Sequence, residues 1–295
     1  MCRLFVSLLL SACVSLAAQN VVTGGNAVSG GKTTSGANWT AGNYTGYVDN
    51  FWVAGNLISN DAQSACWFPT QAAVTGGNLV LTDSYNAGGT ACYSIPSGTS
   101  PTFHYYAAAL YHPKAFLYGT FEVKMQMAST GSNSAFWLLT TNCYPDPFKN
   151  FASNATCGYS GLPTGSQEID VVEYGLSSDD GTTAQNIASP ASGWVQYFPA
   201  TANPTTTPHI YTVYWTSSSI AFYVDGVSTG TYTAQSLTIP MYMWLTNNVA
   251  TASSPTPGEF PTTAVVYYVK HWNGTSGLKS GTVDCSYVPG GPSTC

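Results

Sequence analysis

The sequence predicts an all-β protein, and three observations lead to this fold class. Short runs rich in Val, Ile, Tyr, Phe, Trp and Thr recur along the chain, separated by Gly, Pro, Asn and Ser, as in sandwiches of many short strands. The 295 residues are 44% hydrophobic, enough for a sizeable core, and all-β sandwiches of roughly 200–250 residues form single domains. No repeat or helix-rich segment is present. We therefore expect a β-sandwich in one domain.

The first 18 residues have the composition of a secretory signal. Arg3 precedes an apolar run at 4–10, and small residues follow up to Ala18. The apolar run is too short to span a membrane as a helix, and we expect no membrane span elsewhere. Cys13 ends a Leu-Ser-Ala-Cys sequence, which leaves a lipid anchor on that cysteine as the alternative to full secretion.

The remainder of the chain divides into three parts. Residues 19–37, rich in Gly, Ser and Thr, are expected to form a flexible lead-in. Residues 38–273 are expected to form the β-sandwich domain, and residues 274–295 a tail rich in Gly and Pro. Alternation and β-branched or aromatic composition predict the clearest strands at 78–82, 116–127, 135–140, 167–174, 209–215, 220–227, 241–245 and 265–272.

One of these strands concentrates negative charge. Only 7% of all residues are charged, yet Glu168, Asp170 and Glu173 lie within six positions of an apolar, β-branched run. Strict alternation places Glu168 and Asp170 on one face and Glu173 on the other. A β-bulge after Asp170 would insert one extra residue and bring all three carboxyls to one face.

Such a cluster indicates chemistry, because burying like charges costs free energy without improving packing. Cleavage of a glycosidic bond with retention uses two carboxyl groups about 5–5.5 Å apart, one as nucleophile and one as proton donor. An aspartate between them can hydrogen-bond the nucleophile and raise the pKa of the donor. The alternatives are a calcium site and a solvated strand face.

Five segments of the chain resemble glycoside hydrolase family 16, and together they cover about residues 105–272. They are, in chain order, Tyr-Gly-Thr-Phe-Glu at 118–122, Ala-Phe-Trp-Leu-Leu at 135–139, Glu-x-Asp-x-x-Glu at 168–173, His-x-Tyr-x-x-x-Trp at 209–215 and Ile-x-Phe-Tyr-Val-Asp-Gly at 220–226. The resemblance implies a jelly-roll sandwich of two antiparallel sheets, one of them curved into a concave substrate cleft. It also implies an endo-acting O-glycosyl hydrolase with Glu168 as nucleophile, Asp170 as its helper and Glu173 as acid/base.

The substrate suggested by this resemblance is a neutral β-linked polysaccharide. The Glu-x-Asp-x-x-Glu spacing resembles laminarinase-like and galactan-cleaving members, although Asn133-Ser134 replaces a Trp-Pro of the glucan-cleaving ones. Without residues 1–18, six lysines and no arginine face 13 acids, a net charge of 6 − 13 = −7. This composition disfavours nucleic acid and sulfated galactans, which are bound through Arg and Lys.

We therefore expect a β-1,3- or mixed β-1,3/1,4-glucan as the substrate. An agarose-type galactan hydrolase, a transglycosylase and a lectin-like carbohydrate-binding protein remain alternatives. We expect a monomer without a cofactor, and calcium binding cannot be predicted from the sequence. Aromatic and polar side chains expected to contact sugar, by stacking or by orienting the acids, are Trp137, Trp194, Trp244, Tyr144 and His209.

The cysteines predict a disulfide framework. Cys2 and Cys13 lie within the first 18 residues, which leaves an even number in the expected mature chain. We expect sequential pairing, in which each bond closes a local loop: Cys66 with Cys92, Cys143 with Cys157, and Cys285 with Cys295. A metal site is disfavoured because no Cys-x-x-Cys pair is present.

Overall fold

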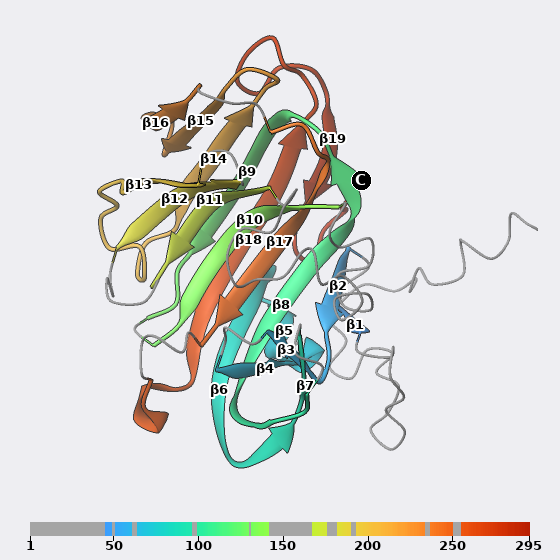
Figure 1. The fold of residues 1–295 in the computed structure, drawn as a ribbon, viewed down its shortest axis with the longest axis vertical. Helices are drawn as coiled ribbons and strands as arrows, with labels where there is room; N and C mark the ends of the chain where they lie inside the picture. Colours follow the sequence, from blue (N-terminus) through green and yellow to red (C-terminus); the bar gives the residue numbers. More distant parts are fainter. Residues whose placement is uncertain are drawn as a thin grey trace, which may run out of the picture.

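A computed structural model describes residues 45–48, 51–60, 64–95, 99–129, 131–141, 167–175, 182–189, 193–233, 237–249 and 255–295. In this part of the chain the fold is a sandwich of two mainly antiparallel sheets (Figure 1). Two short 3-10 helices, η1 (Pro69–Gln71) and η4 (Pro257–Glu259), interrupt the strands. None of the helices described is long and apolar enough to cross a bilayer. The predicted all-β sandwich is confirmed.

The first sheet is named here the β11 sheet, after the strand with the three carboxyls. Its strands lie side by side in the order β1 (Thr45–Val48), β2 (Trp52–Gly55), β8 (Thr102–Phe116), β17 (Met241–Asn248), β10 (Asn133–Thr140), β11 (Glu168–Tyr174), β12 (Thr183–Ser189) and β13 (Gly193–Tyr197). All of these pairings are antiparallel.

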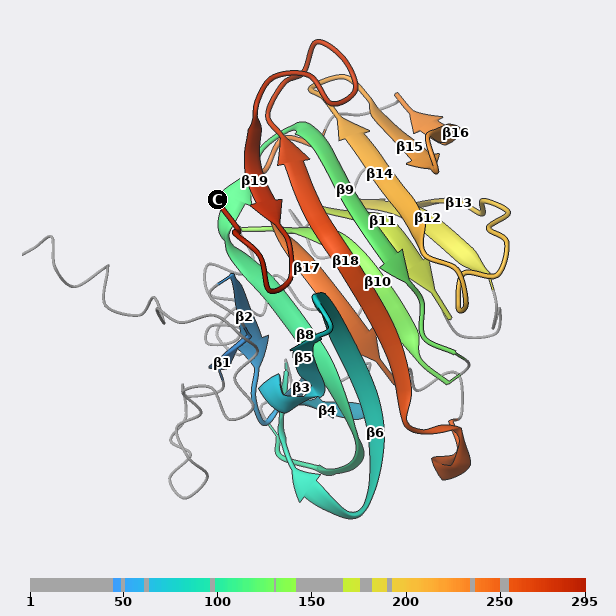
Figure 2. The same ribbon diagram turned by 180° about the vertical axis from the view of Figure 1, so that it is seen from behind.

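The second sheet, the β9 sheet, covers one face of the first and lies in front in Figure 2. Its strands follow the order β16 (Val227–Tyr232), β15 (Ile220–Val224), β14 (His209–Trp215), β9 (Gly119–Gln126), β18 (Thr262–Trp272), β6 (Asn78–Ala91) and β5 (Ala72–Thr75), with β19 (Val283–Tyr287) beside the end of β18. Strands β3 (Ile58–Asn60), β4 (Ala65–Trp67) and β7 (Tyr93–Ile95) add a small third set, in which β3 with β7 and β4 with β8 are parallel.

The main core lies between the two sheets. Alternate residues of both sheets, such as Leu138 and Ile169 from one and Val123 and Phe222 from the other, are fully buried in a single cluster. This alternation agrees with the strand periodicity from which the fold was predicted.

Two expected boundaries are wrong. Residues 116–127 form two strands, because Tyr118 (φ 64°) and Gly119 (φ 107°) turn the chain between β8 and β9. A Cβ on Gly119 would lie 2.2 Å from the carbonyl oxygen of Trp272, so this close approach requires glycine. The strand expected at 220–227 ends at Val224, and Asp225 and Gly226, both with positive φ, form a tight hairpin turn into β16.

The C-terminal segment 274–295 is more than a tail, because it supplies β19 to the β9 sheet. Its expected disulfide, Cys285–Cys295, is present, as is Cys66–Cys92. Cys143 and Cys157 lie outside the described residues.

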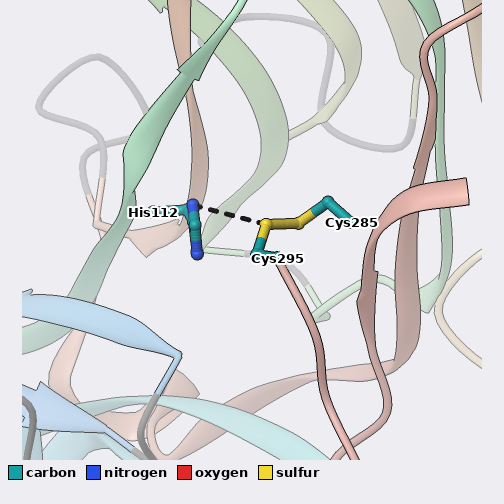
Figure 3. A group of neighbouring side chains, drawn as sticks. All are labelled: His112, Cys285 and Cys295. Atoms are coloured by element: carbon teal, nitrogen blue, oxygen red, sulfur yellow. Dashed lines mark hydrogen bonds between the residues drawn. A yellow bond between two sulfur atoms is a disulfide. The ribbon is translucent and has the colours of Figure 1, made fainter.

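A buried histidine lies against the C-terminal disulfide (Figure 3). Nδ1 of His112 is 3.8 Å from Sγ of Cys295 and accepts a hydrogen bond from the Lys114 backbone N–H. Burial lowers the pKa of His112 to about 4. Among the described residues, His112, Cys285 and Cys295 form the one group of three potential metal ligands with donor atoms within 4.8 Å. Because both sulfurs are in a disulfide, this group is not a metal centre.

Asp83 is a fully buried carboxyl in the inter-sheet core. It lies opposite Thr262 of β18, at a position that alternation gives to the core face. Burial raises its pKa to about 8, and the neighbouring Ser132 and Asn247 only partly oppose this rise. Asp83 is therefore protonated in the folded protein at neutral pH.

Asp83 is expected to make stability depend on pH. Because the folded pKa is above the unfolded value of 3.8, the folded state holds an extra proton between about pH 4 and pH 8, and this contribution makes the free energy of unfolding fall as pH rises through that window. Asp83→Asn should be more stable than the wild type by up to about 5 kcal/mol at pH 8 and nearly equal to it at pH 4.

Urea unfolding at the two pH values measures this difference. Asp225→Asn is the control, because hydrogen bonds from His209 and Ile210 outweigh burial and lower the pKa of Asp225. It should not become more stable than the wild type at pH 8. An Asp83→Asn variant with the same stability change at pH 4 and pH 8 would contradict the buried-proton explanation.

Candidate active site

A one-residue bulge in β11 sets the positions of the three carboxyls. Asp170 pairs with Trp137 of β10, and the next pair along these strands is Val172 with Phe136, so Val171 is the extra residue. On the other side the register shifts by the same one residue between Asp170 and Glu173. The bulge predicted after Asp170 is therefore confirmed.

The bulge directs Glu168, Asp170 and Glu173 to the face of the β11 sheet that points away from the β9 sheet. Val171 and Val172, although adjacent, are both fully buried in the core between the sheets. The carboxyl residues pair with alternate residues of β10 that belong to a second hydrophobic cluster on the opposite face, which we call the outer face: Leu139, Trp137 and Ala135. One strand thus supplies three carboxyls to one surface.

The register across the sheet produces a row of side chains perpendicular to the strands. Asp170 lies in this row, with aromatic residues on one side and amides on the other. The successive members, from β2 to β13, are Val53, Tyr111, Trp244, Trp137, Asp170, Asn186 and Gln196. Neighbouring strands lie about 4.8 Å apart, so this outer-face row is long enough for several sugar units.

The aromatic half of the outer-face row is a continuous stack. The ring centroids of Trp137 and Trp244 are 5.0 Å apart at an interplanar angle of 24°, and Tyr111 follows Trp244 at 5.3 Å. Trp137 is 9% exposed and Trp244 2% exposed. Trp137 is therefore the member beside Asp170 that can meet a ligand, whereas Trp244 supports it from behind.

The edge strand β13 presents exposed rings on the same outer face. Trp194 pairs with Ala188, which pairs with Glu168, and it is 55% exposed. Phe198, just beyond the strand, is 57% exposed. Small residues, Ala184 and Ala188, lie between these rings and the carboxyls, so the surface from β11 to β13 is shallow.

His209 does not lie in this site, contrary to expectation. It begins β14 in the β9 sheet, where Nδ1 is 2.6 Å from the Asp225 carboxylate and Nε2 is 2.8 Å from the Ala202 carbonyl oxygen. A histidine at a strand end gave no information about which sheet would receive the strand. Tyr144 lies outside the described residues.

Burial and like charge raise the pKa of all three carboxyls. Burial raises the pKa of Glu168 to about 8, with a contribution from the charge of Glu173. Burial and the charge of Glu168 raise the pKa of Asp170, which is 1% exposed. The hydrogen bond between the two raises the pKa of Asp170 and lowers that of Glu168. Of the two, Asp170 therefore keeps its proton to higher pH, and Glu168 accepts the hydrogen bond from Asp170 once Glu168 is ionised.

Glu173 is held by a neighbouring amide. Burial raises its pKa well above the ordinary value, and the charge of Asp170 adds to the rise. Nδ2 of Asn186 donates a 2.6 Å hydrogen bond to Oε2 of Glu173, which opposes part of the increase. Glu173 is half-buried and is suited to hold a proton at neutral pH.

The sequence analysis missed Asn186, Gln196 and Tyr111. No local motif distinguishes these residues, because their relation to Asp170 depends on strand pairings between distant segments. The strands β12 and β13, which carry Asn186 and Gln196, were not among the strands predicted from the sequence. Among the described residues, the carboxyls of β11 do not form a group of three with ligand atoms within 4.8 Å of one another.

A row of carboxyls on one face of a two-sheet sandwich, beside an aromatic stack, is the arrangement of a carbohydrate-cleaving enzyme. The comparisons with known proteins agree. The model of glycosyl hydrolases family 16 matches residues 82–288, more than half of the chain. The chain therefore belongs to glycosyl hydrolases family 16 and is an O-glycosyl hydrolase.

Solved structures share the fold at low sequence identity. A LamA variant from Z. galactanivorans in complex with laminaritriose and laminaritetraose is 18% identical, with a TM-score of 0.60 over 78% of this chain and 95% of that one. The laminarinase catalytic domain from Thermotoga maritima is 20% identical, with a TM-score of 0.54 over 71% and 82%. The kappa-carrageenase from Pseudoalteromonas carrageenovora is 20% identical, with a TM-score of 0.56 over 72% and 86%. A search of the curated proteins found no match.

Trp137 is expected to contribute to substrate binding through its ring. Trp137→Ala should lower kcat/KM on the preferred glycan at least ~10-fold, the equivalent of about 1.4 kcal/mol of transition-state binding, while Trp137→Phe should retain more of it. The measurement is initial rates of reducing-end release. Trp272→Ala, which removes a half-buried ring from the β9 sheet, should leave kcat/KM within a factor of about two. Equal losses in both tryptophan variants would show that the effect is one of stability.

Proposed function

We propose that this protein is a secreted, endo-acting, retaining hydrolase of a neutral β-linked polysaccharide, with β-1,3- or mixed β-1,3/1,4-glucan as its substrate. The single observation that carries the proposal is the bulge at Val171, which directs three carboxyls of one strand to one face. In a protein without a catalytic role this arrangement would only lower the stability of the fold, because it buries like charges together.

The roles of the carboxyls follow the family resemblance, and their hydrogen bonds are consistent with these roles. Glu168, which accepts the proton shared with Asp170, is the nucleophile that attacks the anomeric carbon and forms a glycosyl ester. Glu173, which keeps its proton, donates it to the leaving glycosidic oxygen. Water then attacks the anomeric carbon, Glu173 accepts a proton from it, and Glu168 leaves as carboxylate. Two displacements at one carbon retain the β configuration.

The placement of the lysines supports a neutral substrate. Lys114 pairs with Asp284, and Lys279 with Glu122. The two other described lysines, 124 and 270, lie over tyrosine rings of β18. The described part of the outer face therefore presents carboxyls, amides and aromatic rings to a ligand. Sulfate groups would meet no cation there.

The structurally similar proteins include laminarinases and a non-specific endo-β-1,3(4)-glucanase as well as galactan-cleaving enzymes. Glucan is favoured because one of the galactan-cleaving proteins is named for a galactose 4-sulfate, and the outer face has no described cation to pair with sulfate. Agarose remains the second candidate, since it is also uncharged. Secretion is supported by the signal-like composition of residues 1–18 and by the two disulfides, which persist in oxidising compartments.

Digestion of a polysaccharide panel tests the substrate. Laminarin or barley glucan should release new reducing ends as a series of short oligosaccharides, and agarose and kappa-carrageenan should release far fewer. Glu168→Ala should reduce release by at least ~10⁴-fold while circular dichroism stays unchanged. Preferential cleavage of agarose would replace the glucan with a galactan. Longer chains without net reducing ends would indicate a transglycosylase, and binding without any product would indicate a lectin.

Reaction with azide distinguishes the roles of Glu168 and Glu173. The substrate for this experiment is an activated aryl β-glycoside. Glu173→Ala should yield a β-glycosyl azide, because azide replaces water in the second displacement. Glu168→Ala should yield an α-glycosyl azide, because azide then attacks the substrate directly from the opposite face. The reverse pattern would exchange the assignments of nucleophile and acid/base.

The raised pKa values predict an active pH range above that of solvated carboxyls. Protonation of Glu168 stops the nucleophile, so the acid limb of kcat/KM should lie above the ordinary glutamate value of 4.5. Deprotonation of Glu173 removes the donor, so the alkaline limb should also move to higher pH. A pH profile of initial rates checks both limbs, and an optimum at or below 4.5 would contradict the buried geometry.

A further inference from the structure

The bulge in β11 has a dedicated side-chain partner. Among the described strands, Val171 has no residue paired with it in either neighbour. Its backbone carbonyl accepts a 2.9 Å hydrogen bond from Nε2 of Gln185, a fully buried residue of β12. A bulge displaces the backbone of its extra residue from the ladder, so a buried carbonyl at that position needs a donor from elsewhere.

The same amide reaches a second bulge in the opposite sheet. Between β15 and β16 the register shifts by one residue, with Thr229 as the extra residue. The Thr229 hydroxyl donates to Oε1 of Gln185, and the Tyr223 carbonyl accepts from Nε2 at 3.4 Å. Gln185 therefore links the bulge at Val171 in the β11 sheet to the bulge at Thr229 in the β9 sheet through hydrogen bonds.

The next residue, Asn186, holds Glu173 from the other side. It is fully buried and pairs with Asp170, and its Nδ2 donates to Oε2 of Glu173 at 2.6 Å. Adjacent residues of a strand point to opposite faces, so Gln185 contacts the backbone of β11 from the core and Asn186 contacts the carboxyl on the outer face.

We propose that Gln185 and Asn186 act together as positioning residues for Glu173, Gln185 by fixing the bulge and Asn186 by orienting the carboxyl. This proposal rests on the proposed function of Glu173 as acid/base. Gln185 acts through the backbone of Val171, and Asn186 acts through the carboxyl of Glu173. Buried amides are costly to desolvate, so the two donated hydrogen bonds and the one accepted by Gln185 indicate a specific role for this side chain.

The physical basis is the sensitivity of the bulge. If the bulge at Val171 straightens, the strand returns toward simple alternation of side chains. Glu173 then rotates away from the face that carries Glu168. General acid catalysis requires hydrogen-bond contact with the leaving oxygen, so even a small rotation removes proton donation and leaves nucleophilic attack less affected.

Gln185→Leu and Asn186→Leu, near-isosteric variants without an amide, test the proposal. We measure kcat/KM for the preferred glucan, whose leaving group needs a proton, and for a dinitrophenyl β-glycoside, whose leaving group does not. Gln185→Leu should lose ~10–100-fold on the glucan and less than ~3-fold on the aryl glycoside. Asn186→Leu, which also removes a hydrogen bond to Asp170, should lose activity on both substrates and more on the glucan. Asn186→Leu should also move the alkaline limb to higher pH. In the wild type the hydrogen bond from Asn186 lowers the pKa of Glu173, so its removal raises this pKa.

Two further variants give the expected ranking. Thr229→Val removes one partner of Gln185 and keeps its bond to Val171, so its loss on the glucan should be in the same direction but smaller. Thr212→Val, which removes a buried hydroxyl that donates to Glu122 in the β9 sheet, is the matched control and should affect both substrates equally. Equal losses on both substrates in Gln185→Leu, or no loss, would overturn the proposal.

Hydrogen exchange tests the positioning role independently of activity. In Gln185→Leu the amides of Val172 to Tyr174 should exchange at least ~10-fold faster, with those of Glu168 to Asp170 unchanged. Unchanged exchange in both segments would overturn the role of Gln185. A wild-type protein that cleaves no glycan of the panel would refute the proposed function while this measurement still decides whether Gln185 holds the bulge.

Discussion

The structure depends on one extra residue in one strand. Without the bulge at Val171, regular alternation of the same sequence would give Glu173 the face opposite to Glu168 and Asp170. The chain accommodates this residue by burying two consecutive valines in the core and by shifting the register with both neighbouring strands. The β-branched side chains favour an extended backbone on either side of the bulge. The same sequence feature therefore sets the strand, its irregularity and the face of the carboxyls.

The carboxyl cluster is costly, and the surrounding structure offsets the cost in specific ways. A proton shared between Asp170 and Glu168 removes one of the charges, and the hydrogen bond from Asn186 compensates part of the burial of Glu173. The rings of Trp137, Trp244 and Tyr111 pack against one another on one side of Asp170. Asn186 and the three rings come from four strands other than β11, so the sheet has to form before the carboxyls acquire their properties.

Short-range patterns in the sequence were sufficient for much of this architecture. The out-of-phase Glu173 predicted the bulge, because only one irregularity restores a common face. The break at Tyr118 was not predictable from alternation, because it depends on His271, whose Nε2 donates to the Tyr118 carbonyl from 153 residues away. His209 was assigned to the site for lack of information about its sheet. Gln185 and Asn186 acquire their meaning only from strand pairing, which composition does not encode.

The link between the two bulges has a consequence for how this enzyme can change. The hairpin of β15 and β16 is on the sheet that carries none of the three carboxyls, yet it meets Gln185 through Tyr223 and Thr229. With Glu173 in its proposed role, a sequence change in that hairpin would alter proton transfer without altering any residue proposed to contact the sugar. Variation in a distant turn becomes a means by which evolution, or a protein engineer, tunes the chemistry and leaves substrate recognition intact.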